Sequence, residues 1–372
     1  MPRPLQALWV GIVWLLIGRA SYTLNKDTII LFNKNNTPVK QFIKQSELFI
    51  AVESIQASKQ GINNSYLFTV IPSKISVALC LLMLCKWSLH AQNQAGWLGK
   101  LPEEIRESSG LLLLGDRFLT HNDSGNPPVL YELDTAGLEI VRRVTVAGVG
   151  DMDWEALAED EDYLYLGDIG NNQGIRRDLQ ILRISKAVYA DSDWVVPERI
   201  FFSYETQREY VRTPRSDYDA EAMIVGADSI WIFTKQWQKA GTDVYSIPKV
   251  PGEYVAKRIA SYPLGGLITD ACPMPGGDAI LLLGYTPQLQ PFVYKITTDM
   301  SSETSPPRSK KNLLSIGFAQ SEGLAVSPDG FLYISTEAFT NRLVSLPAGV
   351  YRLDLAAEME KGSANEEAET PH

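Results

Sequence analysis

Hydrophobic and polar positions follow one pattern that recurs along the middle and C-terminal parts of the chain. Its fullest version, DMDWEALAEDEDYLYLGDIGNN at residues 151–172, places an acidic residue before two apolar ones, then a polar turn, an alternating run and a Gly/Asn loop. Such alternation is typical of β-strands. The pattern recurs as SSGLLLLGDRFLTHNDSG at 108, DAEAMIVGADSIWIFTKQW at 219, TDACPMPGGDAILLLGYTP at 269 and SEGLAVSPDGFLYISTEAF at 321. The sequence therefore contains five copies of a two-strand unit.

The spacing of the copies indicates the architecture. We call the residue that begins the first strand of each copy its anchor, and the five anchors are Ser109, Glu155, Glu221, Asp270 and Glu322. Successive anchors lie 46, 66, 49 and 52 residues apart, which is the period of β-propeller blades with a long loop in the second repeat. We predict an all-β fold, a five-bladed β-propeller. Six blades are the alternative, because the 66-residue step can hold extra strands.

The ends of the predicted propeller are expected to pair with each other. The last repeat contains EGLAVS, FLYIST and GVYRLDL and lacks one outer strand. The segment GWLGKLP at residues 96–102 can supply that strand by pairing with residues 349–355. This pairing of N- and C-terminal strands closes the ring and removes an exposed sheet edge.

The N-terminal region has a different composition. Residues 74–91 present Lys74, an apolar stretch and a small residue, Ala91, which is the form of a secretory signal peptide. In one explanation, translation begins near Leu67 or Val70, and the mature protein is secreted or periplasmic without a stable membrane span. In the other, the apolar run at 7–18 is a membrane anchor and 75–85 a second apolar helix. The predicted division is an N-terminal extension at 1–73, a signal peptide at 74–91, a propeller at 92–355 and an acidic disordered tail at 356–372.

Composition excludes several classes of function. The formal charge of −10 and the absence of a basic stripe argue against a nucleic-acid surface. Only three histidines exist, so a His-rich zinc site is excluded, and no P-loop, HExxH or GxSxG motif occurs. Of three cysteines, Cys80 and Cys85 lie in the predicted signal segment. The third, Cys272, is expected to be a small core residue rather than a nucleophile.

Propeller geometry brings the anchors together. The starts of the innermost strands share one face, so four carboxylates and the hydroxyl of Ser109 should form a ring around the axis. Converging carboxylates need a positive charge among them, and an all-oxygen set suits Ca²⁺. The alternative is that these acids cap strand starts or pair with arginines such as Arg106 and Arg215.

The loops on the same face carry the candidates for chemistry. Asp123 and Asp168 are candidate general bases, Arg176 and Lys235 candidate stabilisers of negative charge, and His121 the one histidine available for catalysis. The loops before the anchors add Asp151, Asp153, Asp217 and Asp219. The alternative for HNDSG and GDIGNN is turn chemistry, because Asn, Asp and Gly tolerate positive φ and the side chains of Asn and Asp bond the nearby backbone.

The anchors resemble those of the five-bladed calcium-activated nucleotidases (apyrases). This resemblance implies one axial Ca²⁺ held by Ser109, Glu155, Glu221 and Glu322, and hydrolysis of nucleoside di- and triphosphates. Asp270 departs from the family pattern, which has a Ser there. The set SGL, HNDSG, DWEA, GDIGNN and EGLA also resembles a group of secreted bacterial propellers and the SdiA-regulated-type periplasmic propellers, over roughly residues 105–340. That resemblance implies the fold and no particular activity.

These observations predict a secreted or periplasmic monomeric propeller with an axial Ca²⁺ site. We expect it to bind a small anionic molecule, or a glycan, protein or other envelope partner. The alternatives are a Ca²⁺-dependent hydrolase of phosphorylated or otherwise anionic small molecules, similar to the apyrases, and a lactonase-like hydrolase.

Overall fold

A computed structural model describes residues 22–25, 28–32, 38–40, 96–298, 309–340 and 345–360. The chain divides into two compact units, Met1–Lys86 and Trp87–His372. In the first unit, β1 (Tyr22–Asn25), β2 (Thr28–Phe32) and β3 (Pro38–Lys40) form a three-stranded antiparallel sheet. The predicted signal peptide and the apolar runs at 7–18 and 75–85 lie outside the described residues. No helix within the described ranges is long and apolar enough to cross a membrane.

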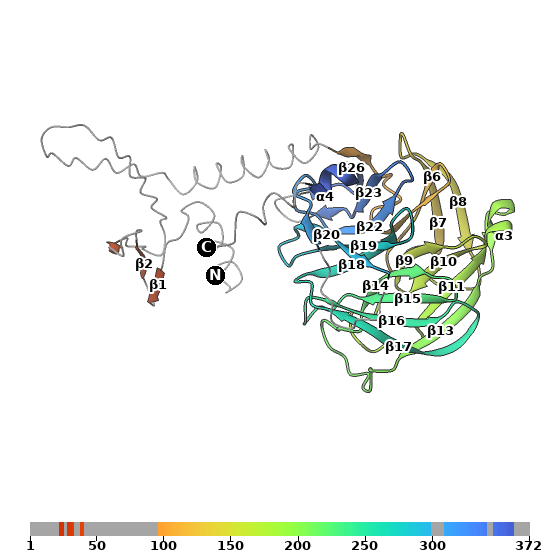
Figure 1. Cartoon of the computed structure of the whole chain (residues 1–372), viewed down its shortest axis with the longest axis horizontal. Helices are drawn as coiled ribbons and strands as arrows, with labels where there is room; N and C mark the ends of the chain where they lie inside the picture. Colours follow the sequence, from red (N-terminus) through yellow and green to blue (C-terminus); the bar gives the residue numbers. More distant parts are fainter. Residues whose placement is uncertain are drawn as a thin grey trace, which may run out of the picture. The chain divides into compact units, whose positions relative to one another are not determined.

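The second unit is built from antiparallel sheets that follow the chain order (Figure 1). The first contains β5 (Ser108–Leu114), β6 (Arg117–Asn122), β7 (Val129–Asp134) and β8 (Ile140–Val146), to which β12 (Trp194–Val195) adds in parallel. An eight-stranded sheet follows, in which two four-stranded sets join through parallel pairing of their outermost strands, β13 and β17. The first set is β9 (Trp154–Glu159), β10 (Tyr163–Asp168), β11 (Gln180–Ser185) and β13 (Glu198–Tyr204). The second set is β14 (Ala220–Val225), β15 (Ser229–Thr234), β16 (Thr242–Pro248) and β17 (Gly252–Tyr262).

Two further four-stranded sheets complete the unit. One contains β18 (Leu267–Pro273), β19 (Ala279–Tyr285), β20 (Pro291–Thr297) and β21 (Ser309–Asn312). The other contains β22 (Ser321–Val326), β23 (Phe331–Thr336), β26 (Gly349–Asp354) and β4 (Trp97–Lys100). A small hairpin of β24 (Phe339–Thr340) and β25 (Ser345–Leu346) stands outside the sheets.

The first strands of the sets form the inside of a closed arrangement. β5, β9, β14, β18 and β22 lie beside one another in this order, and β22 lies beside β5. Apolar clusters fill the space between neighbouring sets, because alternate residues of each strand face the next sheet. Trp154 is fully buried in one cluster, and Cys272, predicted to be a buried core residue, is partly buried and packs against another. The protein is therefore all-β with a β-propeller fold.

The predicted pairing of the two ends is confirmed. β26 pairs antiparallel with β4, with Gly349 opposite Lys100 and Val350 opposite Gly99. Gly349 must lack a side chain here, because a Cβ would lie 2.0 Å from the Trp97 ring. The last sheet is thus completed by a strand from the start of the propeller region.

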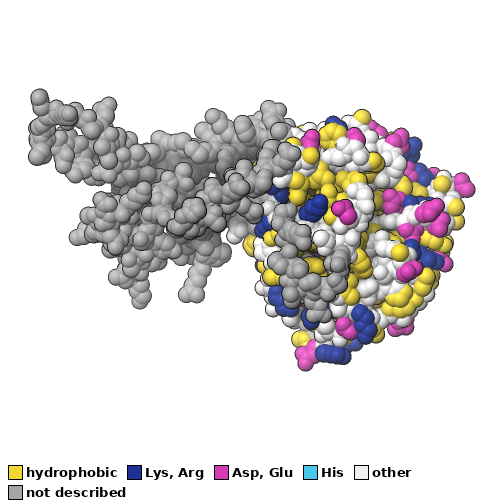
Figure 2. All heavy atoms as spheres, in the orientation of Figure 1, with side chains coloured by type: hydrophobic (Ala, Val, Ile, Leu, Met, Phe, Trp, Pro, Cys, Tyr) yellow, Lys and Arg dark blue, Asp and Glu magenta, His cyan; other side chains and the backbone are white. Residues whose placement is uncertain are grey.

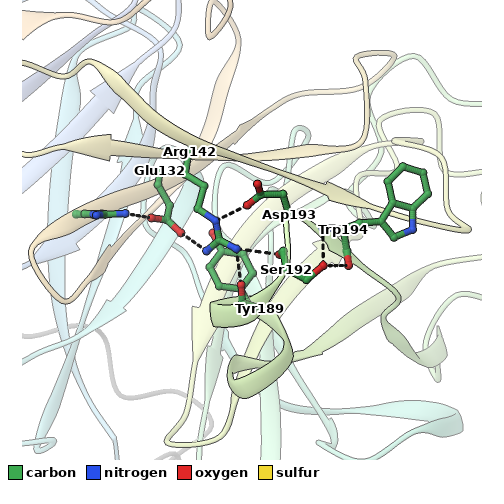
Figure 3. A network of polar contacts seen from close by, with 7 residues as sticks. Glu132, Arg142, Tyr189, Ser192, Asp193 and Trp194 are labelled. Atoms are coloured by element: carbon green, nitrogen blue, oxygen red, sulfur yellow. Dashed lines mark hydrogen bonds and ion pairs between the residues drawn. The ribbon is translucent and has the colours of Figure 1, made fainter.

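The 66-residue step of the second repeat contains a helix and a short strand between β11 and β13 and, before β14, a long connection at residues 205–219. The helix α3 (Lys186–Asp191) and β12 lie against the outer edge of the first sheet (Figure 3). The Arg142 guanidinium on β8 donates to the carboxylate of Asp193 at 2.7 Å and to the carbonyl oxygens of Tyr189 and Ser192. It also pairs with the buried Glu132 at 3.0 Å. This network fastens the second repeat to the first.

The surface of the propeller unit is mixed in character. In the view of Figure 2, acidic, basic and apolar side chains are interspersed over the described part of the molecule, without a broad basic area on this face. This view agrees with the absence of a basic stripe in the sequence.

The C-terminal segment begins with a helix. α4 (Leu355–Glu360) follows β26 directly, and Leu355 and Met359 pack against the apolar cluster between the last two sheets. The start of the tail predicted to be disordered is therefore helical, because two apolar residues at i and i+4 reach this cluster. Residues 361–372 lie outside the described ranges.

Candidate cation site

The anchors occupy irregular positions at the starts of the innermost strands. The pairing of β9, β14 and β22 with their neighbours skips one residue, and that residue is Glu155, Glu221 or Glu322. In β5 the skip covers Ser109 and Gly110. An extra residue of this kind is a β-bulge, which redirects a side chain away from the regular alternation. The bulges explain why these polar anchors are buried near one another.

In β18 the extra residue is Thr269 rather than the predicted anchor Asp270. Both carboxylate oxygens of Asp270 accept backbone N–H bonds, from Ala271 at 2.8 Å and from Leu324 at 2.6 Å. Burial raises the pKa of Asp270 despite these bonds. Asp270 therefore joins β18 to β22 and does not share the structural position of the other anchors.

Two of the remaining anchor acids, Glu221 and Glu322, lie beside a lysine. The ammonium of Lys235, which directly follows β15, lies 2.5 Å from Glu221 and 4.0 Å from Glu322. The same ammonium lies over the rings of Trp237 and Tyr285, at 4.9 and 5.2 Å from their centroids. The side chain of Lys235 is 5% exposed, so this is a buried countercharge.

A separate group of acids consists of Asp123, Asp153 and Glu155. One carboxylate oxygen from each lies within 4.8 Å of the others, and Ser109 donates a hydrogen bond to Glu155 at 2.8 Å. Within the described part of the chain, no Lys or Arg forms an ion pair with any of these three acids. Asp123 and Asp153 are partly exposed, and Glu155 is buried. Oxygen ligands that converge from a buried and a solvent-facing side can hold a hard cation.

A glycine lets the GDIGNN loop close over this group. A Cβ on Gly170 would lie 2.4 Å from the Asp153 carboxylate and 2.8 Å from an oxygen of Glu155. The backbone N–H groups of Ile169 and Gly170 both donate to the carbonyl oxygen of Asp153. The close approach of loop and carboxylates therefore requires glycine at position 170.

Burial and the neighbouring negative charges disfavour the charged forms of Asp153 and Glu155. Burial, together with the neighbouring carboxylates Asp123 and Asp219, raises the pKa of Asp153 to about 7. Burial and the charge of Glu221 raise the pKa of Glu155 well above its ordinary value. A bound cation would favour the charged forms of these acids and offset their mutual repulsion.

Four of the five predicted catalytic residues form ion pairs or hydrogen bonds with other groups of the protein. Arg176 pairs with Asp168 at 2.8 Å, and Asp168 also accepts a hydrogen bond from Gln180 at 2.8 Å. Lys235 pairs with Glu221. His121 is fully buried with its Nδ1 bonded to the Asn122 carbonyl, and burial lowers its pKa to about 4. Of the five, Asp123 alone is a partly exposed residue with no ion pair among the described residues.

The arginines considered as alternative partners of the anchor acids contact other residues. Arg106 pairs with Glu103 at 3.4 Å on the surface, and Arg215 stacks over Trp237. Part of GDIGNN and HNDSG has the predicted turn chemistry: Asn171 accepts from the backbone of Arg176, and Asn122 accepts from the backbone of Glu107. These hydrogen bonds stabilise the two loops, and Asp123 of the first loop lies close to the carboxylates of Asp153 and Glu155.

Comparison with known proteins gives only a distant likeness of fold. No family model and no curated protein matches the chain. The aldose sugar dehydrogenase of Streptomyces coelicolor, in its PQQ-bound form, is 9% identical, with 69% of this chain and 97% of that chain covered and a TM-score of 0.42. A putative 6-phosphogluconolactonase of Bacteroides uniformis is 11% identical, with 68% and 72% covered and a TM-score of 0.34. At this level of similarity, neither ligands nor chemistry transfer to this chain.

Proposed function

We propose that this chain is a five-bladed β-propeller that binds one Ca²⁺ on its axis and uses that ion to hold an anionic ligand or partner. The blade count is supported by five innermost strands that lie beside one another in a closed order. The cation site consists of Asp123, Asp153 and Glu155, with Ser109 bonded to Glu155. Of the anchors predicted to bind the ion, Glu221 and Glu322 instead pair with Lys235.

One observation carries this proposal. Two of the anchor acids, Glu221 and Glu322, lie beside the ammonium of Lys235, whereas three converging carboxylates, those of Asp123, Asp153 and Glu155, have no ion-pair partner in the described ranges. Three converging carboxylates without countercharge repel one another strongly unless they are protonated or bind a cation. The donors are oxygens, which favours Ca²⁺ over Zn²⁺.

The same geometry supports a role in binding. Asp123 and Asp153 are partly exposed residues, so a cation held by them would keep positions open to water or to an anionic group of a ligand. A carboxylate- or phosphate-bearing small molecule, or an acidic glycan or peptide of the cell envelope, fits such a site.

Calcium binding by the full chain at neutral pH tests the proposal. We expect about one Ca²⁺ per chain by equilibrium dialysis, and affinity at least roughly tenfold lower in Asp153→Asn and Glu155→Gln, since each removes a charged ligand. Asp329→Asn is the matched control, because this acid lies in the turn before β23 and accepts a hydrogen bond from Ser327, away from the three acids. Absence of calcium uptake, or equal uptake by all three variants, would contradict the proposal.

A Ca²⁺-dependent hydrolase, acting on phosphorylated or other anionic small molecules or on lactones, is the second candidate. Asp123 favours it, because its carboxylate is partly exposed within the cation group and could accept a proton from a water beside the ion. Phosphate release from nucleotides and ring opening of lactones, assayed with calcium-loaded protein, test this candidate. Calcium binding without turnover would be consistent with the binding function and would exclude hydrolysis of the substrates tested.

We also propose that the protein is secreted or periplasmic and that residues 74–91 act as its signal peptide. The support is the basic flank, apolar middle and small residue of that segment. N-terminal sequencing of exported protein should give a mature end near Gln92, and any other mature end would contradict this assignment.

A further inference from the structure

Four exposed arginines lie on two neighbouring loops of the propeller unit. Arg177 belongs to the loop at residues 169–179, between β10 and β11, and the other three, Arg208, Arg212 and Arg215, belong to the connection at 205–219, between β13 and β14. We call these four residues the arginine patch. A connection of this length without a helix or strand of its own is uncommon in a compact domain, and such loops are often functional.

Hydrogen bonds join the two loops. The backbone N–H groups of Thr213 and Ser216 donate to the carbonyl oxygens of Gln173 and Asn172, at 3.0 and 2.9 Å. The four arginines therefore belong to one continuous surface, although Arg177 is distant from the others in the sequence.

Two of the arginines are positioned by aromatic rings. The guanidinium of Arg177 lies 3.8 Å from the centroid of the Tyr210 ring, and that of Arg215 lies 5.2 Å from the centroid of the Trp237 ring. A guanidinium over a ring keeps the N–H donors at its edges available to an anionic group. These side chains are thus oriented in advance of binding, which lowers the entropy lost when a partner binds.

Most acids of the same loops contact other residues. Four of the five do so: Asp178 pairs with Arg176, Glu205 pairs with Lys257, Asp217 lies beside Lys239, and Asp219 accepts a hydrogen bond from Trp237. The patch arginines, by contrast, form no ion pair with any residue that the structure describes.

The fifth acid, Glu209, lies between two of the arginines in the sequence. Together with Gln207 and Val211, it lines a cavity of about 350 Å³ beneath the connection, whereas Arg208 and Arg212 do not line this cavity. One acid therefore accompanies four arginines, and the surface has a local positive charge in a chain whose formal charge is −10. A local charge of this sign attracts an anionic partner.

The patch is a surface and not a pocket, because none of its four arginines lines the cavity. Arginines spread over two loops can contact several anionic groups of one extended molecule at the same time. An extended partner with repeated anionic groups therefore fits the patch better than a single small anion.

The acids of the cation group limit the shape of this partner. Gly170 belongs to the same loop as Arg177, and a Cβ on it would lie 2.4 Å from the Asp153 carboxylate. A broad anionic surface, such as a membrane, would approach these acids and be repelled. A single narrow chain can contact the arginines alone.

The loops also differ from the surfaces that bind peptides. Peptides are commonly held at a strand edge or in a groove for a helix, and neither loop contains a strand or helix. Ile175 and Pro214 are exposed beside the arginines, so apolar C–H faces of sugar rings could pack against them while guanidinium groups bind the charged substituents.

We propose that the arginine patch binds an acidic polysaccharide, whose carboxylate or sulfate groups accept hydrogen bonds from the guanidinium groups. The patch and the cation group of Asp123, Asp153 and Glu155 share no residue. The proposal is therefore tested without calcium, and it stands or falls separately from the calcium proposal.

Calorimetry on the full chain tests the proposal, after chelator has removed metal and has itself been dialysed away. The probes are polygalacturonate and dextran sulfate, with neutral dextran, poly-L-glutamate and phosphatidylglycerol vesicles as comparators. We expect saturable binding of at least one acidic polysaccharide, which weakens as salt is added because exposed charges are screened, and no binding of neutral dextran. Absence of such binding, or tighter binding of poly-L-glutamate or of vesicles, would overturn the proposal.

A double variant locates the binding. Arg208→Gln combined with Arg212→Gln removes two guanidinium groups from the patch and should weaken polysaccharide binding roughly tenfold or more. Arg106→Gln combined with Arg143→Gln is the matched control, because it changes the net charge equally at side chains that are 59% and 52% exposed outside the patch. An equal loss in both double variants would show that net charge and not the patch determines binding, which would overturn the assignment.

Arg177→Gln keeps the test decisive if the double variant does not fold, since it changes one exposed residue of the other loop. It should weaken binding roughly threefold or more. The thermal transition of each variant checks its folding. Polysaccharide binding that is unchanged in the folded patch variants would also overturn the assignment.

Discussion

Lys235 and Glu221 form a buried ion pair at 2.5 Å beside the start of the innermost strand β14. The lysine follows β15, and the glutamate is the second residue of β14, the antiparallel neighbour of β15. The backbone N–H of Lys235 also donates to the Asp219 carbonyl, which fixes its place beside the strand start. Glu221 and Glu322 thus have a cation from the protein nearby, whereas we assign Asp123, Asp153 and Glu155 to Ca²⁺.

Replacing Lys235 by Met should destabilise the protein strongly. Removing one partner of a buried pair leaves the other charge buried, which typically costs about 3–5 kcal/mol. We expect a fall of this size in the free energy of unfolding measured by denaturant titration in chelator. The exposed Lys257→Gln should change it by less than about 0.5 kcal/mol. A Lys235→Met variant as stable as the wild type would show that the pair contributes little.

Adding a methyl group at Gly170 should impair calcium binding without changing any charge. In Gly170→Ala the new Cβ would meet the carboxylates of Asp153 and Glu155, which must then move apart. We expect calcium affinity to fall at least roughly tenfold, as measured by calorimetry, because the coordinating oxygens no longer converge. Gly150→Ala is the control, since a Cβ at this position would meet no atom within 4 Å. Equal affinities would contradict the assigned site.

Much of the fold follows from patterns in the sequence. The alternating runs of five repeats predict strands, because residues of one face recur every second position. Their spacing predicts the propeller, and the missing strand of the last repeat predicts pairing with residues near Trp97, which β4 and β26 confirm. The helix α3 and strand β12 were not predicted, because they lie within a spacing that a long loop explains equally well.

The site was harder to predict, because it depends on strand register. An acid followed by a small residue selects Asp270 in the fourth repeat, but the bulge in β18 falls on Thr269. Register arises from how whole strands pair, and a shift of one residue moves a side chain to another environment. The alternative to a bound cation was that the acids pair with arginines such as Arg106 and Arg215, whereas Lys235 lies beside Glu221 and Glu322 because it follows directly at the end of β15.

Asp270→Asn distinguishes the structural role of Asp270 from the predicted metal role. The amide has one acceptor oxygen instead of two, so one of the N–H groups of Ala271 and Leu324 loses its charged partner. We expect a loss of about 1–3 kcal/mol in the free energy of unfolding with unchanged calcium stoichiometry. Asp278→Asn, in the turn before β19, is the control. Loss of calcium with unchanged stability would restore Asp270 as a ligand.

The stability should depend on pH through Asp160. Burial alone would raise the pKa of Asp160, but hydrogen bonds from Lys249, Tyr165 and two backbone N–H groups lower it to about 2. Since the folded pKa lies below the unfolded one, the ionised form stabilises the fold above about pH 4. That stabilisation is lost as the pH falls toward about 2.

The Asp160→Asn variant isolates this contribution. Its unfolding free energy should be lower than that of the wild type by about 1 kcal/mol at about pH 6, with the partial exposure of Asp160 included. The difference should disappear near pH 2. Denaturant titrations of both proteins over this pH range measure it, and a difference that stays constant down to about pH 2 would contradict the role of the ionised carboxylate.

The most direct measurement is the metal content of the purified full chain, taken together with its thermal transition in calcium and in chelator. The axial site predicts about one calcium per chain, and a transition several degrees lower when chelator removes it, because an ion bound only to the folded state stabilises that state. A chain that carries no calcium and melts at the same temperature in both buffers would contradict the cation site. The repulsion among the carboxylates of Asp123, Asp153 and Glu155 would then have to be relieved by protonation or by other protein groups.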